Sequence, residues 1–268
     1  MAVPAKKRSP AAPPARPNLV AAARGKAPPR HGGWRENVRS ILGALLIFLV
    51  VRTFLVEAFR IPSGSMIPTL LVGDWLFVNK LVYGPHIPFT DVNLPGYGDP
   101  ERKDVVVFES PYQPDEAMRG ADPTPTLVKR LWGTPGDTLY MRDGLLYVNG
   151  VPQPQPAAMA QNPVGDPGYV APHFAWQAQY ALHDTRFGSA PAQPTLGNWG
   201  PILIPADHYF MLGDNRYESK DSRYWGLVPR ANLRGRPMFV YYSWEAERHR
   251  PFGFLRDIRW DRIGHRIR

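Results

Sequence analysis

One apolar stretch in the chain could form the centre of a membrane-spanning helix, and such a helix limits how the rest of the chain can fold. Residues 41–51 are apolar without interruption, and a second apolar group, residues 54–56, follows Arg52 and Thr53. These residues alone fall short of the roughly 20 that a spanning helix needs. A helix over residues 34–59 would reach about 39 Å, because an α-helix rises 1.5 Å per residue. The sequence therefore predicts one transmembrane anchor helix over residues 34–59.

Basic residues are concentrated in front of this helix. The chain carries a net charge of +9, and residues 1–40 hold nine Lys and Arg residues against the single acid Glu36. Because Lys- and Arg-rich segments stay on the cytoplasmic side, the N-terminus is predicted to be cytoplasmic and everything after about residue 57 to lie outside. The rest of the chain is nearly neutral, so its composition does not support a basic groove for nucleic acid.

Residues 1–33 are of low complexity, since 16 of these 33 residues are Ala or Pro. Such a segment cannot bury enough apolar surface to fold, so we interpret it as a disordered cytoplasmic tail. An arm that contacts nucleic acid or lipid headgroups remains open. The alternative of a cleaved signal peptide is disfavoured, because the basic region is too long and no small-x-small site follows the apolar stretch.

The segment directly after the anchor is suited to a rigid, exposed loop. Its prolines remove backbone donors and bias the preceding residues away from helix, and its glycine admits backbone angles that other residues resist. Such a loop can hold an exposed hydroxyl, and the segment contains two serines, two residues apart: Ile61-Pro62-Ser63-Gly64-Ser65-Met66-Ile67-Pro68-Thr69-Leu70.

The remainder, residues 60–268, is predicted to be one extracytoplasmic domain with a mainly β, antiparallel fold. An Asp-Gly turn at residues 143–144 predicts a hairpin. Residues 151–205 are rich in proline and weakly periodic, which predicts an inserted, loop-rich cap. Residues 252–263 could rest on the membrane or add a last strand. The predicted strands are residues 75–78, 104–108, 126–132, 138–142, 145–148, 205–212 and 238–244.

A serine hydroxyl needs a base before it becomes a good nucleophile, and Lys129 is a candidate base. The chain has no cysteine, which excludes a thiolate nucleophile and disulfides, and its histidines stand in no recognisable triad or metal-binding pattern. Lysine can act as a base when burial lowers the pKa of its amine. Strand alternation places Leu127 and Leu131 on the same side as Lys129, so the pattern predicts a buried amine.

Four sequence blocks follow the membrane segment in order. The blocks are the Ser-Gly-Ser-Met loop at residues 63–66, Arg102-Lys103-Asp104-Val105-Val106-Val107-Phe108, Leu127-Val128-Lys129-Arg130-Leu131-Trp132-Gly133-Thr134-Pro135-Gly136-Asp137, and residues 213–226 from Gly213-Asp214-Asn215-Arg216 to Tyr224-Trp225-Gly226. Together they closely resemble the bacterial type I signal peptidases (leader peptidases), which are serine–lysine proteases. Two further stretches, Gly73-Asp74 and Arg259-Trp260-Asp261-Arg262-Ile263-Gly264, extend the similarity over roughly residues 40–265.

The resemblance implies a role for each matching residue. Ser65 would be the nucleophile that forms an acyl-enzyme, and Lys129 the general base. Ser63 would join the Ser65 backbone N–H in the oxyanion hole, and Ser219 would orient the lysine amine. Two further groups of residues are implied: a supporting ion pair of Asp221 with Arg223, and a pocket lining of Phe59, Ile61, Pro62, Met66, Leu70 and Val128.

The same resemblance implies the function. The chain would be a membrane-bound serine endopeptidase that cleaves N-terminal signal peptides from exported preproteins after small residues, in the pattern Ala-x-Ala. It would need no cofactor and no metal. Its partners would be preproteins and the lipid bilayer, with no nucleic acid and an unknown oligomeric state. It would sit in the bacterial cytoplasmic (inner) membrane as a single-pass protein with its catalytic domain on the outer, periplasmic face.

Two rival interpretations remain at this stage. The first is another serine–lysine protease, such as a self-cleaving SOS repressor or a conjugation-pilus maturation peptidase; the anchor and the lack of an evident helix-turn-helix disfavour the repressor. The second is a membrane-tethered β scaffold or binding protein with a dead site. Loss of Ser65 or Lys129 would mark such a scaffold, and both residues are present.

Overall fold

The computed structural model describes residues 33–90, 92–154, 171–248 and 251–268. The chain divides into two compact units, residues 1–45 and 46–268. Helix α1 (Trp34–Val50) continues into the π-helical turn η2 (Val51–Leu55). Together they form one helix, Trp34–Leu55, that is long and apolar enough to cross a membrane. The predicted disordered tail lies outside the described residues, apart from Gly33.

The helix ends four residues before the predicted end at Phe59. Strand β1 (Val56–Arg60) begins directly at Val56, whose backbone is extended with φ −138° and ψ 135°. The expectation of helix over residues 34–59 is therefore wrong for residues 56–59. The reason is tertiary: β1 pairs antiparallel with β2 (Asp74–Asn79) over its whole length, and this pairing satisfies backbone groups that a longer helix would have bonded internally.

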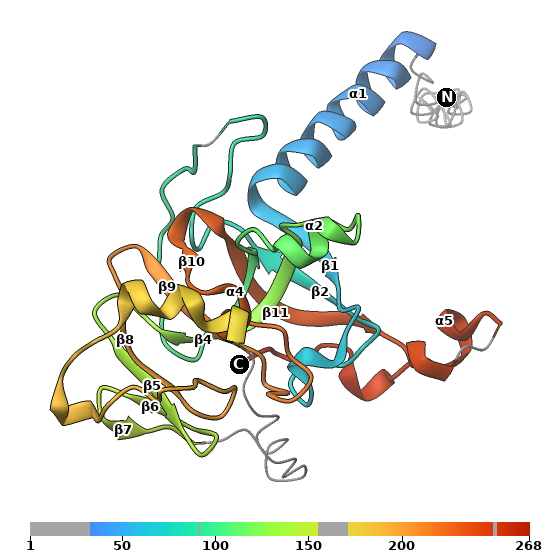
Figure 1. Ribbon diagram of the computed structural model, residues 1–268. Coiled ribbons are helices and arrows are strands. Elements are labelled where there is room, and N and C mark those ends of the chain that lie inside the picture. The colour runs from blue at the N-terminus through green and yellow to red at the C-terminus, as the bar shows by residue number, and fades with distance from the viewer. Residues whose placement is uncertain (1–32, 91, 155–170, 249–250) are drawn as a thin grey trace, which may run out of the picture. The chain divides into compact units, whose positions relative to one another are not determined.

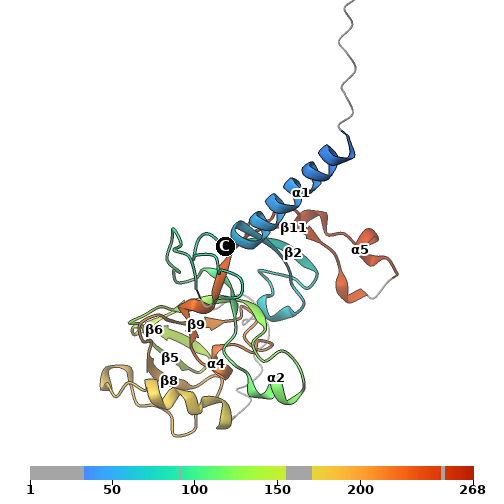
Figure 2. The same ribbon diagram turned by 90° about the horizontal axis from the view of Figure 1, so that it is seen from above.

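The second unit is built from two antiparallel sheets, which confirms the predicted mainly β fold (Figures 1 and 2). The larger sheet has the strand order β1-β2-β11-β3-β4-β9-β10, and the smaller has the order β7-β6-β5-β8. In both views β5, β6 and β8 gather at one end of this unit, away from β2. The remaining strands are β3 (Val105–Glu109), β4 (Thr126–Gly133), β5 (Thr138–Arg142), β6 (Leu145–Val148), β7 (Val151–Pro152), β8 (Trp199–Leu203), β9 (His208–Leu212), β10 (Val228–Pro229) and β11 (Leu233–Ser243).

The described helices other than α1 and η2 are short. Residues 252–263, for which the sequence left two options open, form helical turns with one isolated bridge, Trp244 to Ile258, rather than a last strand. The short elements are η3 (Gly64–Met66), α2 (Pro114–Met118), η4 (Ala171–Tyr180), η5 (Thr185–Phe187), α4 (Ser222–Trp225), η6 (Arg230–Asn232), η7 (Ala246–Arg248), α5 (Gly253–Arg256) and η8 (Trp260–Arg262).

The larger sheet curls strongly, and the curl creates the site. Three strands separate β1 from β4, so a flat sheet would hold them about 19 Å apart at about 4.8 Å per strand. Residues of β1 and β4 nevertheless line one small pocket. The eleven-residue strand β11 has register shifts against both β2 and β3, and such bulges bend a strand.

The predicted cap is more ordered than a loop. Of residues 151–205, the described part contains β7, η4, η5 and β8, and β8 pairs with β5 in the smaller sheet. Residues 155–170 of the predicted cap lie outside the described residues. The smaller sheet has its own core, in which Trp199, Ile202 and Leu139 are fully buried. Its strand β5 follows β4 after a short turn, so the smaller sheet is covalently joined to the strand that carries Lys129.

Candidate active site

Ser65 and Lys129, which are 64 positions apart in the sequence, meet in the structure. Lys129 Nζ lies 2.6 Å from Ser65 Oγ, within hydrogen-bond distance. Both side chains are buried, with exposed fractions of 7% for Ser65 and 4% for Lys129. The buried amine that the strand pattern predicts at position 129 is therefore confirmed.

Burial sets the protonation behaviour of Lys129. Its cross-strand neighbour on β3 is Val106, which is fully buried, and Leu131 on its own strand is fully buried too. Desolvation penalises the ammonium form and lowers the pKa of Lys129 to about 8, although the carboxylates of Asp221 and Asp214 act in the opposite direction. A useful fraction of the amine is thus neutral near neutral pH.

The loop that carries Ser65 is held by the segment after β9. Ser65 is the middle residue of the 3₁₀ turn η3 (Gly64–Met66), and Ser63, just before this turn, has an extended backbone. The Asn215 backbone N–H donates to the carbonyl oxygen of Ser65 over 3.0 Å, and the Asn215 side-chain amide donates to the carbonyl oxygen of Gly64 over 3.3 Å. The position of the hydroxyl is therefore fixed from a distant part of the chain.

Asp221 and Arg223 form the expected ion pair, and it is fully buried. Arg223 Nε donates to Asp221 over 2.8 Å and Nη2 donates over 2.9 Å, with exposed fractions of 3% and 0% for the two residues. Desolvation opposes ionisation of Asp221, but the Arg223 guanidinium and the Gly213 backbone N–H hold the pKa of that carboxyl below its usual value. The Asp221 carboxylate also accepts the Gly213 N–H over 3.1 Å, which ties this pair to the end of β9.

Ser219 lies beside the site without a bond to the amine. Its side chain is buried, and its Oγ makes no hydrogen bond of ordinary geometry to the described residues. A methyl group on Gly213 would stand 2.2 Å from Ser219 Oγ and 2.5 Å from the Ser65 carbonyl oxygen, so the three residues are tightly packed. The orienting role expected for Ser219 therefore stays a prediction.

A pocket of about 30 Å³ opens beside the Ser65–Lys129 pair. Five of the six residues predicted to bind substrate line it, as does Ser63. Leu70 is not among the lining residues: it is fully buried in the core cluster that also contains Met66 and Val128, and its assignment to the pocket stays a prediction. The lining residues are Phe59, Ile61, Pro62, Ser63, Ser65, Met66, Thr126, Leu127, Val128 and Lys129.

Known proteins match most of this chain. A family described as "Signal peptidase, peptidase S26" matches residues 34–244. The chain belongs to this signal peptidase family. Signal peptidase I of Pseudomonas aeruginosa is 38% identical over 221 residues, covering 78% of this chain and 72% of that protein. Probable signal peptidase I-2 of Synechocystis is 32% identical over 217 residues, covering 81% and 77%.

The chain is also similar to solved structures. One of them is a signal peptidase I from Enterococcus faecalis, 29% identical in sequence, which matches 52% of this chain and 96% of that chain with a TM-score of 0.31.

Within this member of the signal peptidase family, sequence reasoning missed a second group of charged residues behind the site. Arg130, next to Lys129, donates to both carboxylate oxygens of Asp214 over 2.7 and 2.6 Å, and the Thr69 hydroxyl donates to Asp214 over 2.6 Å. Asp214 lies in the sequence block of residues 213–226, but the resemblance implied no role for it. Its position between Gly213 and Asn215, which both contact the site, was the available signal.

Charged residues of the sequence blocks also contact one another elsewhere in the fold of this signal peptidase family member. Arg262 donates to Asp74 over 2.5 Å, and Ser243 Oγ donates to Asp74 over 2.6 Å. Arg102 donates to Asp137 over 2.7 Å. These buried or half-buried contacts explain why charged residues recur in the quoted blocks without belonging to the site. Among the residues that the structure describes, no group of three or more His, Asp or Glu side chains could hold a metal ion.

Proposed function

We propose that the chain is a membrane-anchored serine endopeptidase that cleaves signal peptides from preproteins with a Ser65–Lys129 dyad. The observation that carries the proposal is the distance of 2.6 Å between the buried amine and the serine hydroxyl. Membership of the signal peptidase family supports the reaction class.

The backbone around the pocket is suited to an extended peptide. The N–H and C=O of Ile61 both bond toward β2, and those of Leu131 both bond toward β3. Because bonding alternates along an antiparallel strand, the backbone groups of Arg60 and Val128 face the other way, toward the groove. The pairing of β4 with β9 begins only at Arg130, so Val128 lies beyond that ladder. A preprotein strand placed between β1 and β4 would satisfy both free edges.

The dyad would work by covalent catalysis. The neutral amine of Lys129 takes the proton of Ser65 while Ser65 Oγ attacks the scissile carbonyl carbon. Lys129 then gives that proton to the leaving amine of the mature protein, and an ester links Ser65 to the signal peptide. Water then attacks this ester while Lys129 accepts a proton from it, and Lys129 returns that proton to Ser65 Oγ as the ester bond breaks, which releases the signal peptide and restores the dyad.

Ser63 is the proposed side-chain donor to the oxyanion. It lines the pocket with Ser65, and its side chain is exposed, which leaves its hydroxyl free to turn toward substrate. Each donor aimed at the developing charge contributes typically about 3 kcal/mol. The backbone N–H of Ser65 would be the second donor.

The small pocket supports a preference for Ala-x-Ala. Met66, Ile61 and Val128 are buried members of one apolar cluster and form its walls. A space of about 30 Å³ accepts a methyl group and leaves no room for a long side chain. Because the walls belong to a packed core, enlarging the pocket would cost stability.

The anchor gives the proposed location. The helix Trp34–Leu55 would span the bacterial inner membrane once, with the basic N-terminus in the cytoplasm and the peptidase unit on the outer face. Strand β1 follows the helix without a linker, so the edge that receives substrate starts at the membrane end of the unit. A preprotein whose apolar segment lies in the same bilayer would meet this edge first.

The test compares purified wild type, Ser65→Ala and Lys129→Ala on a preprotein that carries an Ala-x-Ala site, in detergent. We expect wild type to cut after that site and both variants to lose at least about 1000-fold in kcat/KM, since nucleophile and base act as a unit. A wild type that does not cut, or a Ser65→Ala variant that still does, would overturn the proposal. Unfolding of both variants at the wild-type temperature serves as the control for folding.

A further inference from the structure

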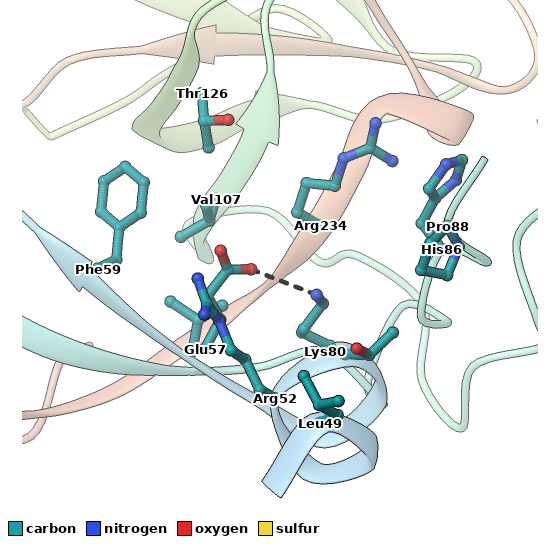
Figure 3. Close-up of a pocket in the computed structure, with 12 residues that line it drawn as sticks. Leu49, Arg52, Glu57, Phe59, Lys80, His86, Pro88, Val107, Thr126 and Arg234 are labelled. Atoms are coloured by element: carbon teal, nitrogen blue, oxygen red, sulfur yellow. Dashed lines mark ion pairs between the residues drawn. The ribbon is translucent and has the colours of Figure 1, made fainter. Parts of the chain in front are cut away.

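A larger cavity adjoins the small pocket, and the dyad does not use it. Its volume is about 460 Å³, and it is lined by the end of the membrane helix, by side chains of β1, β2, β3, β4 and β11, and by the segment that follows β2 (Figure 3). Phe59 and Thr126 line both this cavity and the small pocket, so the two spaces are neighbours. We call it the charged cavity, because Arg52, Lys80, Arg234 and Glu57 line it.

The charged cavity continues the groove in a definite direction. Along β1 the wall passes from Phe59 to Glu57, and then to Arg52 and Leu49 on the helix. The part of a preprotein that precedes the cleaved bond carries the apolar segment, which must lie toward the membrane helix. On the proposed function, therefore, the segment before the cleaved bond runs from the small pocket into the charged cavity.

The distance along β1 from the small pocket to the charged cavity indicates which substrate residues reach that cavity. Glu57 lies two residues beyond Phe59 on β1, which corresponds to about 7 Å of extended chain. A bound strand with small residues in the pocket would therefore place the segment about four to seven residues before the cleaved bond in the charged cavity.

Cationic side chains predominate around this cavity. Lys80 is ion-paired with Glu57 over 3.3 Å, as Figure 3 shows, and Arg234 is ion-paired with Glu109, which is not among the residues that line the cavity. Arg52 is exposed and forms no ion pair with any described residue. The two carboxylates thus offset two of the three cations, and one positive charge remains without a partner at the helix end.

We infer that the charged cavity reads the charge of the preprotein segment about four to seven residues before the cleaved bond. It favours Asp or Glu there and disfavours Lys or Arg. A substrate carboxylate gains Arg52 as a partner and also approaches Lys80, whereas a substrate cation adds a like charge in a concave, half-buried space. This inference rests on the proposed function and adds a charge preference to it.

The experiment uses the full-length enzyme and three preproteins that differ only at the sixth residue before the cleaved bond, which is Asp, Asn or Lys. The readout is the ratio of kcat/KM for the Asp substrate to that for the Lys substrate, in uncharged detergent at low salt. We expect a ratio of roughly 10 for wild type, which falls toward 1 in 0.5 M salt, because exposed charges are screened.

Two variants and a matched control locate the effect. Arg52→Gln should bring the ratio close to 1, and Arg52→Glu should invert it. Arg186→Gln removes another exposed arginine, in η5 and outside the charged cavity, and should keep the wild-type ratio. Since Arg52 is exposed, neither Arg52 variant should change the temperature of unfolding.

The outcomes separate this inference from the proposed function. If wild type cleaves all three substrates with equal kcat/KM, the proposed function stands and the charge preference is overturned. If it cleaves none, both fail. A third result would assign the cavity to a lipid phosphate instead: the Arg52 variants lose activity on all three substrates alike, and only when phosphatidylglycerol vesicles replace detergent. That result overturns the inference.

Discussion

A lysine acts as a base only while its amine is neutral, and this makes the activity depend on pH in a definite direction. The pKa of Lys129 is lowered to about 8 because the amine is desolvated. We therefore expect kcat/KM to rise with pH through about 8 and then to level off. At pH 6, two units below this value, kcat/KM should be roughly 100-fold below its plateau. The measurement is a pH profile with a substrate that has no titrating group near its cleavage site.

The same profile can refute the assignment. A midpoint near 10.5, the ordinary value for lysine, would mean that the amine is solvated and that the buried position of Lys129 is wrong. Lys129→Arg offers a second check, because a guanidinium of similar length cannot give up its proton at these pH values. This variant should be inactive throughout the profile.

Asp221 tests whether the ion pair beneath the site stabilises the fold. Asp221→Asn would leave the Arg223 guanidinium buried without its charge partner, and such losses cost about 3–5 kcal/mol of unfolding free energy. Urea denaturation should show this loss as a lower midpoint. The matched control is Asp184→Asn, which breaks an exposed Asp–Arg pair in η5 and should leave the midpoint nearly unchanged. Equal midpoints for the two variants would contradict the argument.

Above the single residue, the end of strand β9 is the element that brings the parts of the site together. Gly213 contacts the Ser65 loop and Ser219, and a methyl group there would meet Ser219 Oγ at 2.2 Å and the Ser65 carbonyl oxygen at 2.5 Å. Gly213→Ala should displace Ser65 from Lys129 and lower kcat/KM by about 100-fold, since small misplacements of catalytic groups are costly. The comparison is Gly98→Ala, whose methyl group would meet its nearest neighbour at an ordinary 3.4 Å and should keep wild-type kcat/KM.

Strands with a local signal were predicted from the sequence, and strands defined by distant pairing were not. The Asp143-Gly144 turn predicted the hairpin that β5 and β6 form. Strand β1 was taken as helix, because its residues continue the apolar stretch and nothing local reveals its pairing with β2. Strand β8 contains Gly200-Pro201 and was taken as loop. Among the named strands, β8 is an edge of its sheet, and proline is tolerated at an edge because its missing N–H interrupts no ladder.

The site shows the same division between local and distant information. Burial of Lys129 followed from alternation along β4, whereas its meeting with Ser65 depended on the curl of the larger sheet and came only from resemblance to a family. Leu70 shows where local information stops: it follows Ser65 in the same sequence block, but it is fully buried and does not line the small pocket, so its place in the substrate site stays a prediction. Proximity in sequence to Ser65 does not decide whether a side chain lines the pocket.

At the scale of the whole molecule, the direct junction between the membrane helix and β1 couples location to chemistry. The helix ends at Leu55 and β1, the strand proposed to receive substrate, starts at Val56, so no flexible linker separates the candidate anchor from the proposed groove. A peptidase built in this way should act on substrates held in the same membrane, and its orientation decides which preproteins it meets.

Orientation can be measured cleanly because the chain has no cysteine. We expect Ser9→Cys, in the basic N-terminal segment, to be shielded in intact spheroplasts from a membrane-impermeant maleimide, and Ala192→Cys, which is exposed in the peptidase unit, to react. After detergent lysis both variants should react, which controls for the reactivity of each thiol. The reason is the charge asymmetry across the helix, with nine basic residues and one acid before residue 41. The opposite labelling pattern would place Ser65 and Lys129 on the cytoplasmic side, where a preprotein has not yet crossed the membrane. That result would contradict the proposed orientation.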